Sequence, residues 1–347
     1  MIKVDIISGF LGAGKTTLIK HLLAHAYENE NVVLIENEFG EIGIDGGFLK
    51  EAGIEIREMN SGCICCSLVG DFSSSLKEVV DTYHPDRILI EPSGVGKLSD
   101  VATAVKNVAE DLQLEICHRI VVADVTKCKM YLKNFGEFYK NQIENASTII
   151  LSRTDIAKEE KTAEALELLK ELNSVAAIVT TPVDKLEDAV LIKALDNTAS
   201  AMDMLADVEE EHEHHHDHGE HCCHHDHEEE HEHHHEHGEH CGCHHDHDHD
   251  HHHHHADDVF TSWGMETNTA YSKKQLEEIF AKFETETKGT ILRSKGIVKD
   301  ADSDQFIYFD YVPGQVDIRV GSPDYIGKVC VIAAGYTEDE LKDIFTK

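Results

Sequence analysis

The sequence has few basic residues for its length. It contains 31 Lys and Arg against 67 Asp and Glu, which gives a formal net charge of −36 at pH 7. Nucleic acids and anionic membrane surfaces select proteins with clustered Lys and Arg. The composition therefore argues against a nucleic acid or a membrane as the main partner.

The sequence also lacks a long apolar run and an N-terminal targeting signal. No window approaches 18 consecutive apolar residues, and residues 1–9 hold no basic region followed by an apolar stretch and a cleavage site. We therefore expect a soluble, cytoplasmic protein. The 347 residues exceed twice the usual domain length of about 150, which predicts at least two domains and excludes a disulfide-stapled miniprotein.

Most of the ten cysteines are grouped. In a reducing compartment such grouping indicates metal binding rather than disulfide bonds. Cys117, Cys128 and Cys330 stand alone among largely apolar neighbours, which is typical of packing cysteines. The other seven form three tight groups: Cys63, Cys65 and Cys66; Cys222 and Cys223; Cys241 and Cys243.

Short apolar runs alternate with amphipathic stretches through residues 1–200. This alternation predicts an α/β domain with a doubly wound, mostly parallel sheet and helices on both faces. Ligands of such sheets bind at the carboxyl ends of the strands. The predicted strands are Lys3–Ser8, Val32–Glu36, Arg87–Glu91, Arg119–Asp124, Thr148–Leu151 and Ala177–Thr180, and helices include Thr16–Ala26, Phe72–Tyr83 and Lys161–Leu172.

Residues 201–257 have the composition of a disordered linker. Residues 209–258 hold 24 His, 18 acidic residues and no Lys, Arg or aromatic residue, so almost nothing in them can be buried. Imidazoles, carboxylates and four thiols offer many exchangeable sites for Zn²⁺, Ni²⁺, Cu²⁺ or Co²⁺. We interpret the linker as a metal buffer; a solubilising spacer and a pH-responsive tether are the alternatives.

Residues 258–347 are predicted to form a small α+β domain. Two capping signatures, Ser272-x-x-Gln275 and Thr337-x-x-Glu340, mark the starts of its helices. Strands are expected near Val259–Met265, Ile291–Val298, Gln305–Tyr311, Val316–Val320 and Val329–Ala333, with helices near Lys273–Phe283 and Glu338–Phe345.

A complete phosphate-binding loop follows the first predicted strand and precedes a helix. The sequence is Gly-Phe-Leu-Gly-Ala-Gly-Lys-Thr over residues 9–16. Its glycines let backbone amides surround a phosphate, Lys15 neutralises phosphate charge, and Thr16 can bind Mg²⁺. The predicted nucleotide contacts here are Gly9, Gly12, Ala13, Gly14, Lys15, Thr16 and Thr17.

A second predicted nucleotide segment is Ser152-Arg153-Thr154-Asp155, after the strand at Thr148–Leu151. A carboxylate at Asp155 can accept both N1–H and the N2 amine of guanine, which adenine does not offer. The segment resembles the Asn-Lys-x-Asp guanine motif, with Ser152 and Arg153 in place of Asn and Lys. ATP as the nucleotide, or a simple helix-capping role for Asp155, are the alternatives.

Two acidic residues end buried strands. Glu91 precedes Pro92-Ser93-Gly94, where a carboxylate can hold Mg²⁺ directly or through water and the glycine can move with the γ-phosphate. Asp124 ends another strand in the same way, and for it a functional and a structural role are both open.

The Gly62-Cys63-Ile64-Cys65-Cys66 segment predicts a thiolate metal site. In a straight strand Cys66 would oppose the other two cysteines, so the backbone must turn for all three to converge. Three thiolates with a fourth ligand suit tetrahedral Zn²⁺, and Co²⁺ or Cu(I) also fit. Glu36, Glu41 or a water is the expected fourth ligand; redox sensing is the functional alternative.

The sequence resembles the CobW family of metal-chaperone GTPases. The resemblance is carried by the phosphate loop, residues 36–41, the Cys-x-Cys-Cys segment, residues 91–94 and the His-rich linker. This family is related to the nickel-inserting GTPases of urease and hydrogenase maturation. The resemblance implies that Cys63, Cys65 and Cys66 bind metal and that residues 36–45 form the first switch, with Asp45 orienting the attacking water. It departs from the family at Ser152 and Arg153, and at Pro92 in the second switch.

These observations predict a GTPase that binds a divalent metal at the three cysteines and delivers it to a client metalloprotein. Zn²⁺ is the metal that we expect. Lys15, Asp45 and Glu91 are the expected catalytic residues, and GTP, Mg²⁺ and Zn²⁺ the expected ligands. A cobalt- or nickel-insertion GTPase, a metal storage protein with an uncoupled nucleotide site, and a small-molecule phosphotransferase remain alternatives. A homodimer is also left open, and the C-terminal domain is the expected place for client recognition or for dimer contact.

Overall fold

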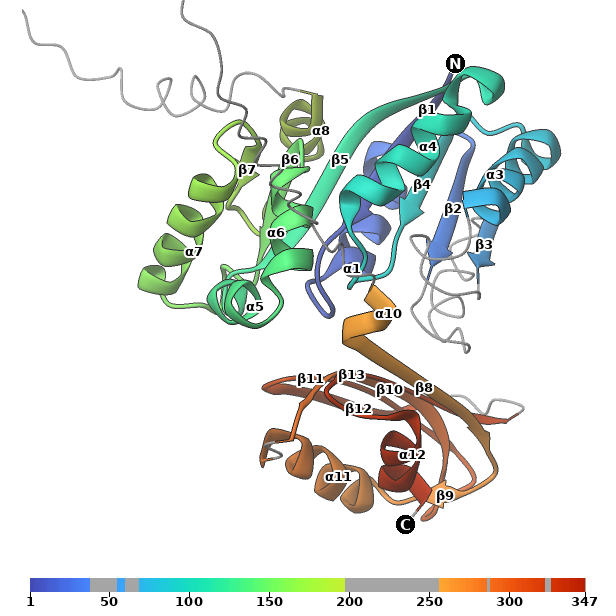
Figure 1. Ribbon diagram of the computed structural model, residues 1–347, viewed down its shortest axis with the longest axis vertical. Helices are drawn as coiled ribbons and strands as arrows, with labels where there is room; N and C mark the ends of the chain where they lie inside the picture. Colours follow the sequence, from blue (N-terminus) through green and yellow to red (C-terminus); the bar gives the residue numbers. More distant parts are fainter. Residues whose placement is uncertain (38–54, 60–68, 197–255, 286–287, 322–325, 347) are drawn as a thin grey trace, which may run out of the picture. The chain divides into compact units, whose positions relative to one another are not determined.

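The computed structural model describes residues 1–37, 55–59, 69–196, 256–285, 288–321 and 326–346 (Figure 1). Within these residues two sheets are present, one in the N-terminal part of the chain and one in the C-terminal part. The predicted fold class is confirmed for both. The predicted linker lies outside the described residues, and the boundaries at residues 200 and 257 remain predictions.

In the described residues the N-terminal sheet has seven strands in the order β3-β2-β4-β1-β5-β6-β7, and every neighbouring pair is parallel. Parallel neighbours need crossover connections, and the helices provide them. The strands are β1 Ile2–Ser8, β2 Val32–Asn37, β3 Glu55–Met59, β4 Arg87–Glu91, β5 Leu114–Asp124, β6 Thr148–Ser152 and β7 Ala177–Val179.

Helices cover both faces of this sheet, as predicted. One face carries α1 Lys15–His21, the π-helix η1 Leu22–Ala26 and α8 Asp188–Asp196, which pack on Ile7, Leu34 and Leu89. The other face presents Val4, Ile6, Val33, Ile35 and Ile88 to the helices that cover it. Its helices are α3 Val69–Tyr83, α4 Leu98–Leu112, α5 Cys128–Asn134, α6 Gly136–Glu144 and α7 Glu159–Leu172, and a short 3₁₀ helix, η3, spans Val183–Lys185.

The structure corrects three details of the prediction. The predicted helix Thr16–Ala26 changes to a π-helix after His21, where the Tyr27 N–H bonds to the Leu22 carbonyl five residues back. Strand β5 begins at Leu114 rather than Arg119. Its first half was missed because it mixes buried, half-buried and exposed residues and forms no continuous apolar run. Strand β3 was not predicted.

A second sheet of six strands lies in the C-terminal part, in the order β12-β11-β10-β13-β8, with β9 paired to β10. Helices α11 Lys273–Thr285 and α12 Glu338–Thr346 contribute Leu276, Phe280 and Leu341 to its core. The capping box at Ser272 and Gln275 is present, with the Gln275 backbone nitrogen 3.3 Å from the serine Oγ. The other elements are α10 Ala256–Val259, β8 Phe260–Thr267, β9 Ala270–Tyr271, β10 Thr290–Asp300, β11 Phe306–Val312, β12 Gln315–Gly321 and β13 Gly327–Ala334.

A fully buried carboxylate, Asp5, joins three strands of the N-terminal sheet. Its Oδ2 accepts hydrogen bonds from Tyr27 at 2.8 Å and from the Arg87 guanidinium, and its Oδ1 lies 2.8 Å from His118 Nδ1. Asp5, Arg87 and His118 come from β1, β4 and β5. A charge in the core is tolerated only when it is paired and hydrogen-bonded, so this network fixes how the three strands lie together.

Removing the Asp5 carboxylate should destabilise the N-terminal domain strongly. Asp5→Ala leaves Arg87 and His118 buried without their partner, and breaking such a pair costs about 3 to 5 kcal/mol. Urea unfolding would measure the loss, with the exposed Asp111→Ala on α4 as a control that changes stability by less than about 0.5 kcal/mol. Equal effects for the two variants would contradict the structural role of Asp5.

The contribution of His118 should depend on pH. Burial lowers its pKa, but the hydrogen bonds and charges of Asp5 and Asp196 outweigh burial and raise the pKa above its usual value. The stabilisation is then complete below the unfolded pKa of about 6.5 and is lost as the pH rises through the raised folded pKa. Urea unfolding of His118→Gln should show a larger destabilisation at about pH 6 than at about pH 9; a pH-independent difference would contradict this assignment.

Candidate functional site

The carboxyl ends of the parallel strands gather the predicted nucleotide-site residues at one edge of the sheet. Ser8 pairs in register with Val121, Glu36 with Glu91, and Asp124 with Ser152. These strand residues therefore lie along the same edge of the sheet. This is the edge at which the sequence predicts ligand binding.

The phosphate-binding loop has a backbone that glycine alone adopts readily. Gly9, Gly12 and Gly14 have φ values of 140°, 69° and 106°. A Cβ atom at Gly9 would also lie 2.4 Å from the carbonyl oxygen of Val122 on β5. The loop is thus a preformed backbone cradle between β1 and the N-terminus of α1, as a phosphate group requires.

An aromatic cluster anchors the loop from behind. The ring of Phe10 lies 4.3 Å from that of Tyr131 and 5.6 Å from that of Phe135, measured between centroids. The Tyr131 hydroxyl donates a 3.4 Å hydrogen bond to the Leu11 carbonyl. Because Phe10 is almost completely buried, the loop cannot move without disrupting the core beneath it.

Lys15 lies at the centre of the edge and is only 5% exposed. Its Nζ donates a 3.0 Å hydrogen bond to the Gly9 carbonyl and lies 3.7 Å from Oε1 of Glu91. The ammonium therefore points across the cradle toward the end of β4. A nucleotide phosphate fits this arrangement, since its anionic oxygens could take the places that the Glu91 carboxylate and the Gly9 carbonyl oxygen have beside the ammonium.

Glu91 ends β4 beside this lysine, and Glu36, one residue before the end of β2, pairs in register with Glu91. Glu36 is buried, the side chain of Glu91 is 14% exposed, and Thr16 lies in the first turn of α1. Carboxylate and hydroxyl oxygens are the ligands that Mg²⁺ prefers beside phosphates. The residues at this edge therefore fit a Mg²⁺-nucleotide, and when bound the ion would offset phosphate charge.

Asp124 has a structural role. Its Oδ1 accepts hydrogen bonds from the backbone N–H and the hydroxyl of Thr126, at 2.9 and 2.6 Å. Its Oδ2 lies 2.9 Å from Nε of Arg153. Both oxygens thus contact groups of the protein, which supports the structural role, and the functional role stays a prediction.

Arg153 reaches the phosphate loop. Its Nη2 donates to the Gly12 carbonyl at 3.3 Å, and its backbone has a φ of 63°, which is uncommon for a residue other than glycine. Ser152 also borders the loop, because its Cβ would lie 3.8 Å from a Cβ at Gly14. Asp155 is exposed two residues further on. The structure thus brings Ser152 and Arg153 to the loop, and the base-reading role of Asp155 stays a prediction.

The predicted metal ligands are described only in part. Glu36 is placed, whereas Glu41, Asp45, Cys63, Cys65 and Cys66 lie outside the described residues. Strand β3, which precedes the cysteine segment, ends at Met59 in register with Asn37 of β2. Among the described residues no group of three or more His, Cys, Asp or Glu side chains could hold a metal ion.

Cys128 behaves as the packing cysteine that the sequence predicts. It is buried, and its Sγ accepts a 3.0 Å hydrogen bond from the Tyr139 hydroxyl. Burial raises the pKa of its thiol to about 11, so it stays protonated at neutral pH.

Sequence reasoning missed a contact that holds the segment after Glu91. The fully buried Gln142 of α6 donates hydrogen bonds from Nε2 to the carbonyls of Gly94 and Gly96, at 3.1 and 2.9 Å. A Cβ at Gly94 would lie 2.8 Å from Cδ2 of Leu11. The segment is therefore packed on the phosphate loop and tied to a helix, and no local pattern around Gln142 signals this.

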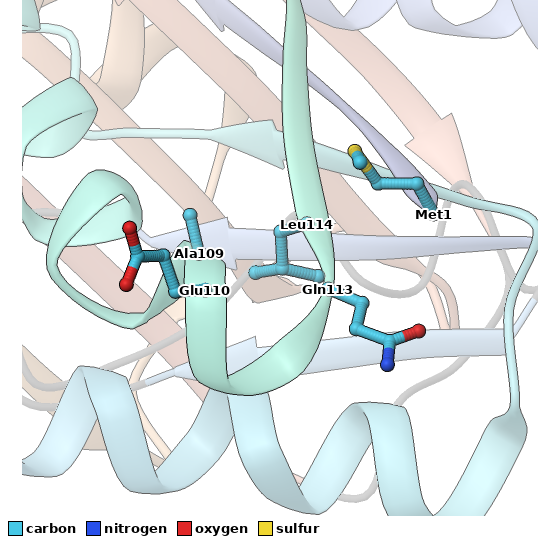
Figure 2. A pocket seen from close by; sticks show the side chains of 5 residues that line it. All are labelled: Met1, Ala109, Glu110, Gln113 and Leu114. Atoms are coloured by element: carbon cyan, nitrogen blue, oxygen red, sulfur yellow. The ribbon is translucent and has the colours of Figure 1, made fainter.

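A shallow pocket lies at the opposite edge of the sheet. Met1, Ala109, Glu110, Gln113 and Leu114 line it (Figure 2). Ile2 and Leu114, which are paired in register, are the first residues of β1 and β5. The pocket is therefore remote from the strand ends that carry the phosphate loop and is not part of the nucleotide site.

The parallel sheet, the glycine cradle after its central strand and the lysine that crosses the cradle define a P-loop nucleotide-binding protein. The chain belongs to the CobW/HypB/UreG family of P-loop GTPases: the family model described as "CobW/HypB/UreG, nucleotide-binding domain" matches residues 3–180. A second model, "Cobalamin synthesis protein cobW C-terminal domain", matches residues 260–347. The resemblance seen in the sequence is thereby confirmed.

Curated relatives include two proteins of Escherichia coli (strain K12). The "Zinc chaperone YeiR" is 36% identical over 159 residues, which cover 45% of this chain and 47% of the relative. The "Zinc chaperone YjiA" is 32% identical over 193 residues, covering 52% and 57%. The matched regions thus span about half of each relative. The solved structure of Zn(II)-bound YjiA GTPase aligns over 99% of this chain and 98% of its own, at 18% identity and a TM-score of 0.43.

No helix among the described residues is long and apolar enough to cross a membrane.

Replacing Lys15 should abolish tight nucleotide binding. Lys15→Met removes the buried ammonium from the cradle, and the loss of hydrogen bonds to a charged group weakens binding by about 10 to 150-fold. Fluorescent GDP and GTP analogues would measure the dissociation constants. Lys20→Met, on the exposed side of the same helix, is the matched control. If Lys15→Met bound as tightly as Lys20→Met, the cradle would not be the phosphate site.

Proposed function

We propose that this protein is a GTP-hydrolysing metallochaperone that binds Zn²⁺ at Cys63, Cys65 and Cys66 and delivers it to a client metalloprotein as the nucleotide turns over. The observation that carries the proposal is the position of Glu36. This predicted metal ligand is the last but one residue of β2 and pairs in register with Glu91, the carboxylate that faces Lys15. On its other side β2 pairs with β3, the strand that leads into the cysteine segment.

In this proposal Lys15 binds the phosphates, and Thr16 and Glu91 bind Mg²⁺. Asp45 orients the attacking water. GTP is preferred because Asp155 can pair with guanine, and the contact of Arg153 with Gly12 supports a nucleotide at this edge. The zinc-chaperone names of the relatives favour Zn²⁺ as cargo over Co²⁺ or Ni²⁺. Grouped thiolates suit a reducing compartment such as the cytoplasm.

Nucleotide and metal can influence each other if the residues between them change position with the γ-phosphate. Glu36 belongs both to the predicted first switch and to the predicted zinc ligands. A rearrangement of the switch would therefore change the fourth zinc ligand. Coupling free energies between sites in proteins are about 1 to 3 kcal/mol, which corresponds to a change in affinity of about 5 to 150-fold.

Zinc affinity should therefore depend on the nucleotide. With Mg²⁺ present, Zn²⁺ would be titrated into the full chain against a high-affinity chelator, with GDP or a non-hydrolysable GTP analogue bound. The chelator outcompetes the weak imidazole sites, and the cysteine variants described next separate the predicted site from the four linker thiols. We expect affinities that differ by about 5 to 150-fold between the two states.

Two variants test whether the tight zinc binding belongs to the three cysteines. Replacing Cys63, Cys65 and Cys66 with serine should remove the tight site, whereas Cys117→Ser, at a partly exposed cysteine outside the motif, should leave it intact. Equal zinc affinity in both nucleotide states would contradict coupling and favour a storage protein. Tight binding that survives the triple replacement would contradict the assignment of the ligands.

A further inference from the structure

Strand β12 is an exposed edge of the C-terminal sheet. Among the described residues it pairs with β11 alone, and it is the last strand in the sheet order (Figure 1). Val316 and Val320 are 45% and 58% exposed. An edge strand presents unpaired backbone N–H and C=O groups, and natural proteins usually protect such edges from pairing with another chain.

The sequence of this edge is self-complementary. Residues 316–320 read Val-Asp-Ile-Arg-Val. If two copies of the strand pair antiparallel about Ile318, each Val316 lies opposite Val320 of the other copy, and each Asp317 lies opposite Arg319. Such pairing places identical surfaces against each other, which is the requirement for a two-fold symmetric dimer.

The apolar and the charged residues of β12 lie on opposite faces of the strand. Val316, Ile318 and Val320 are in register with Tyr311, Phe309 and Ile307 of β11, which are part of the domain core. A second copy would extend this apolar row across the interface. The row is incomplete at the edge of a single copy, because both valines are still exposed.

The opposite face carries the charges. Asp317 is in register with Asp310 of β11, so two carboxylates lie on neighbouring strands. Arg293 pairs with Asp310 at 3.0 Å, and Arg319 lies 3.3 Å from Asp317 in the same strand. In the proposed pairing, Arg319 of a second copy would lie opposite Asp317, on the side of β12 away from β11. Its positive charge would then offset the negative charge of the neighbouring carboxylates Asp317 and Asp310.

We propose that β12 is a homodimerisation edge, at which two copies of this chain pair antiparallel about Ile318 to form one continuous sheet. The occupant is a second copy rather than an unrelated strand because the charge pattern is complementary to itself. Dimerisation through this edge does not require a nucleotide.

The test is a charge swap in the full chain without added nucleotide. Sedimentation velocity over a range of concentrations should show self-association of the natural chain. Asp317→Arg places arginine opposite arginine, and Arg319→Asp places aspartate opposite aspartate, so each variant should dimerise about tenfold or more weakly. Lys273→Glu, which reverses an exposed charge on α11, is the matched control and should dimerise normally.

Mixing the two single variants should restore association, because both arginines of the Asp317→Arg strand then lie opposite aspartates of the Arg319→Asp strand. With one variant fluorescently labelled, the expected species is a heterodimer. The double variant Asp317→Arg/Arg319→Asp should again form homodimers, which also shows that the substitutions do not prevent folding. A natural chain that is monomeric throughout, association that is insensitive to the reversals, or a mixture that fails to recover would each overturn the proposal.

Discussion

The buried carboxylate of Asp5 is the constraint on which the arrangement of the nucleotide edge depends. A charge with no exposure must be neutralised in place, and its partners Arg87 and His118 stand on the two strands that flank β1. Three residues beyond Asp5, β1 ends and the phosphate loop begins. The strands that carry Glu91 and Asp124 are held by the same network. A polar cluster in the middle of the sheet thus fixes the relative positions of groups at its edge.

The edge itself is divided between two tasks. From β1 toward β6, the groups that contact the phosphate loop are held in place by the protein: Asp124 fixes Arg153, and Arg153 reaches the Gly12 carbonyl. From β4 toward β3, Glu91 and Glu36 are carboxylates that pair in register near the ends of adjacent strands. The first side is suited to rigid recognition of a nucleotide. The second holds the two carboxylates that are predicted to bind metal ions.

Much of the fold could be predicted because its signals are local. The buried strands are nearly continuous apolar runs, and the phosphate loop is recognisable because its glycines adopt backbone conformations that other residues avoid. Strand β3 was missed because Glu55, Arg57 and Glu58 interrupt its apolar residues, although the alternation from Ile54 to Arg57 is itself a strand pattern. The contacts of Arg153 with Gly12 and of Gln142 with Gly94 and Gly96 could not be predicted. They join residues 141, 48 and 46 positions apart, and only the folded sheet brings them together.

The two hydrogen bonds from Gln142 also determine how a displacement at Glu91 would be transmitted. The carbonyls of Gly94 and Gly96 are fastened to one side chain on α6, so the freedom of this segment lies in the residues before them. A shift of the strand end that Pro92 and Ser93 do not take up must either break both hydrogen bonds or move α6 as well. The amide group of Gln142 thus links this segment to helix α6. Any displacement that reaches Gly94 and Gly96 would therefore also act on that helix.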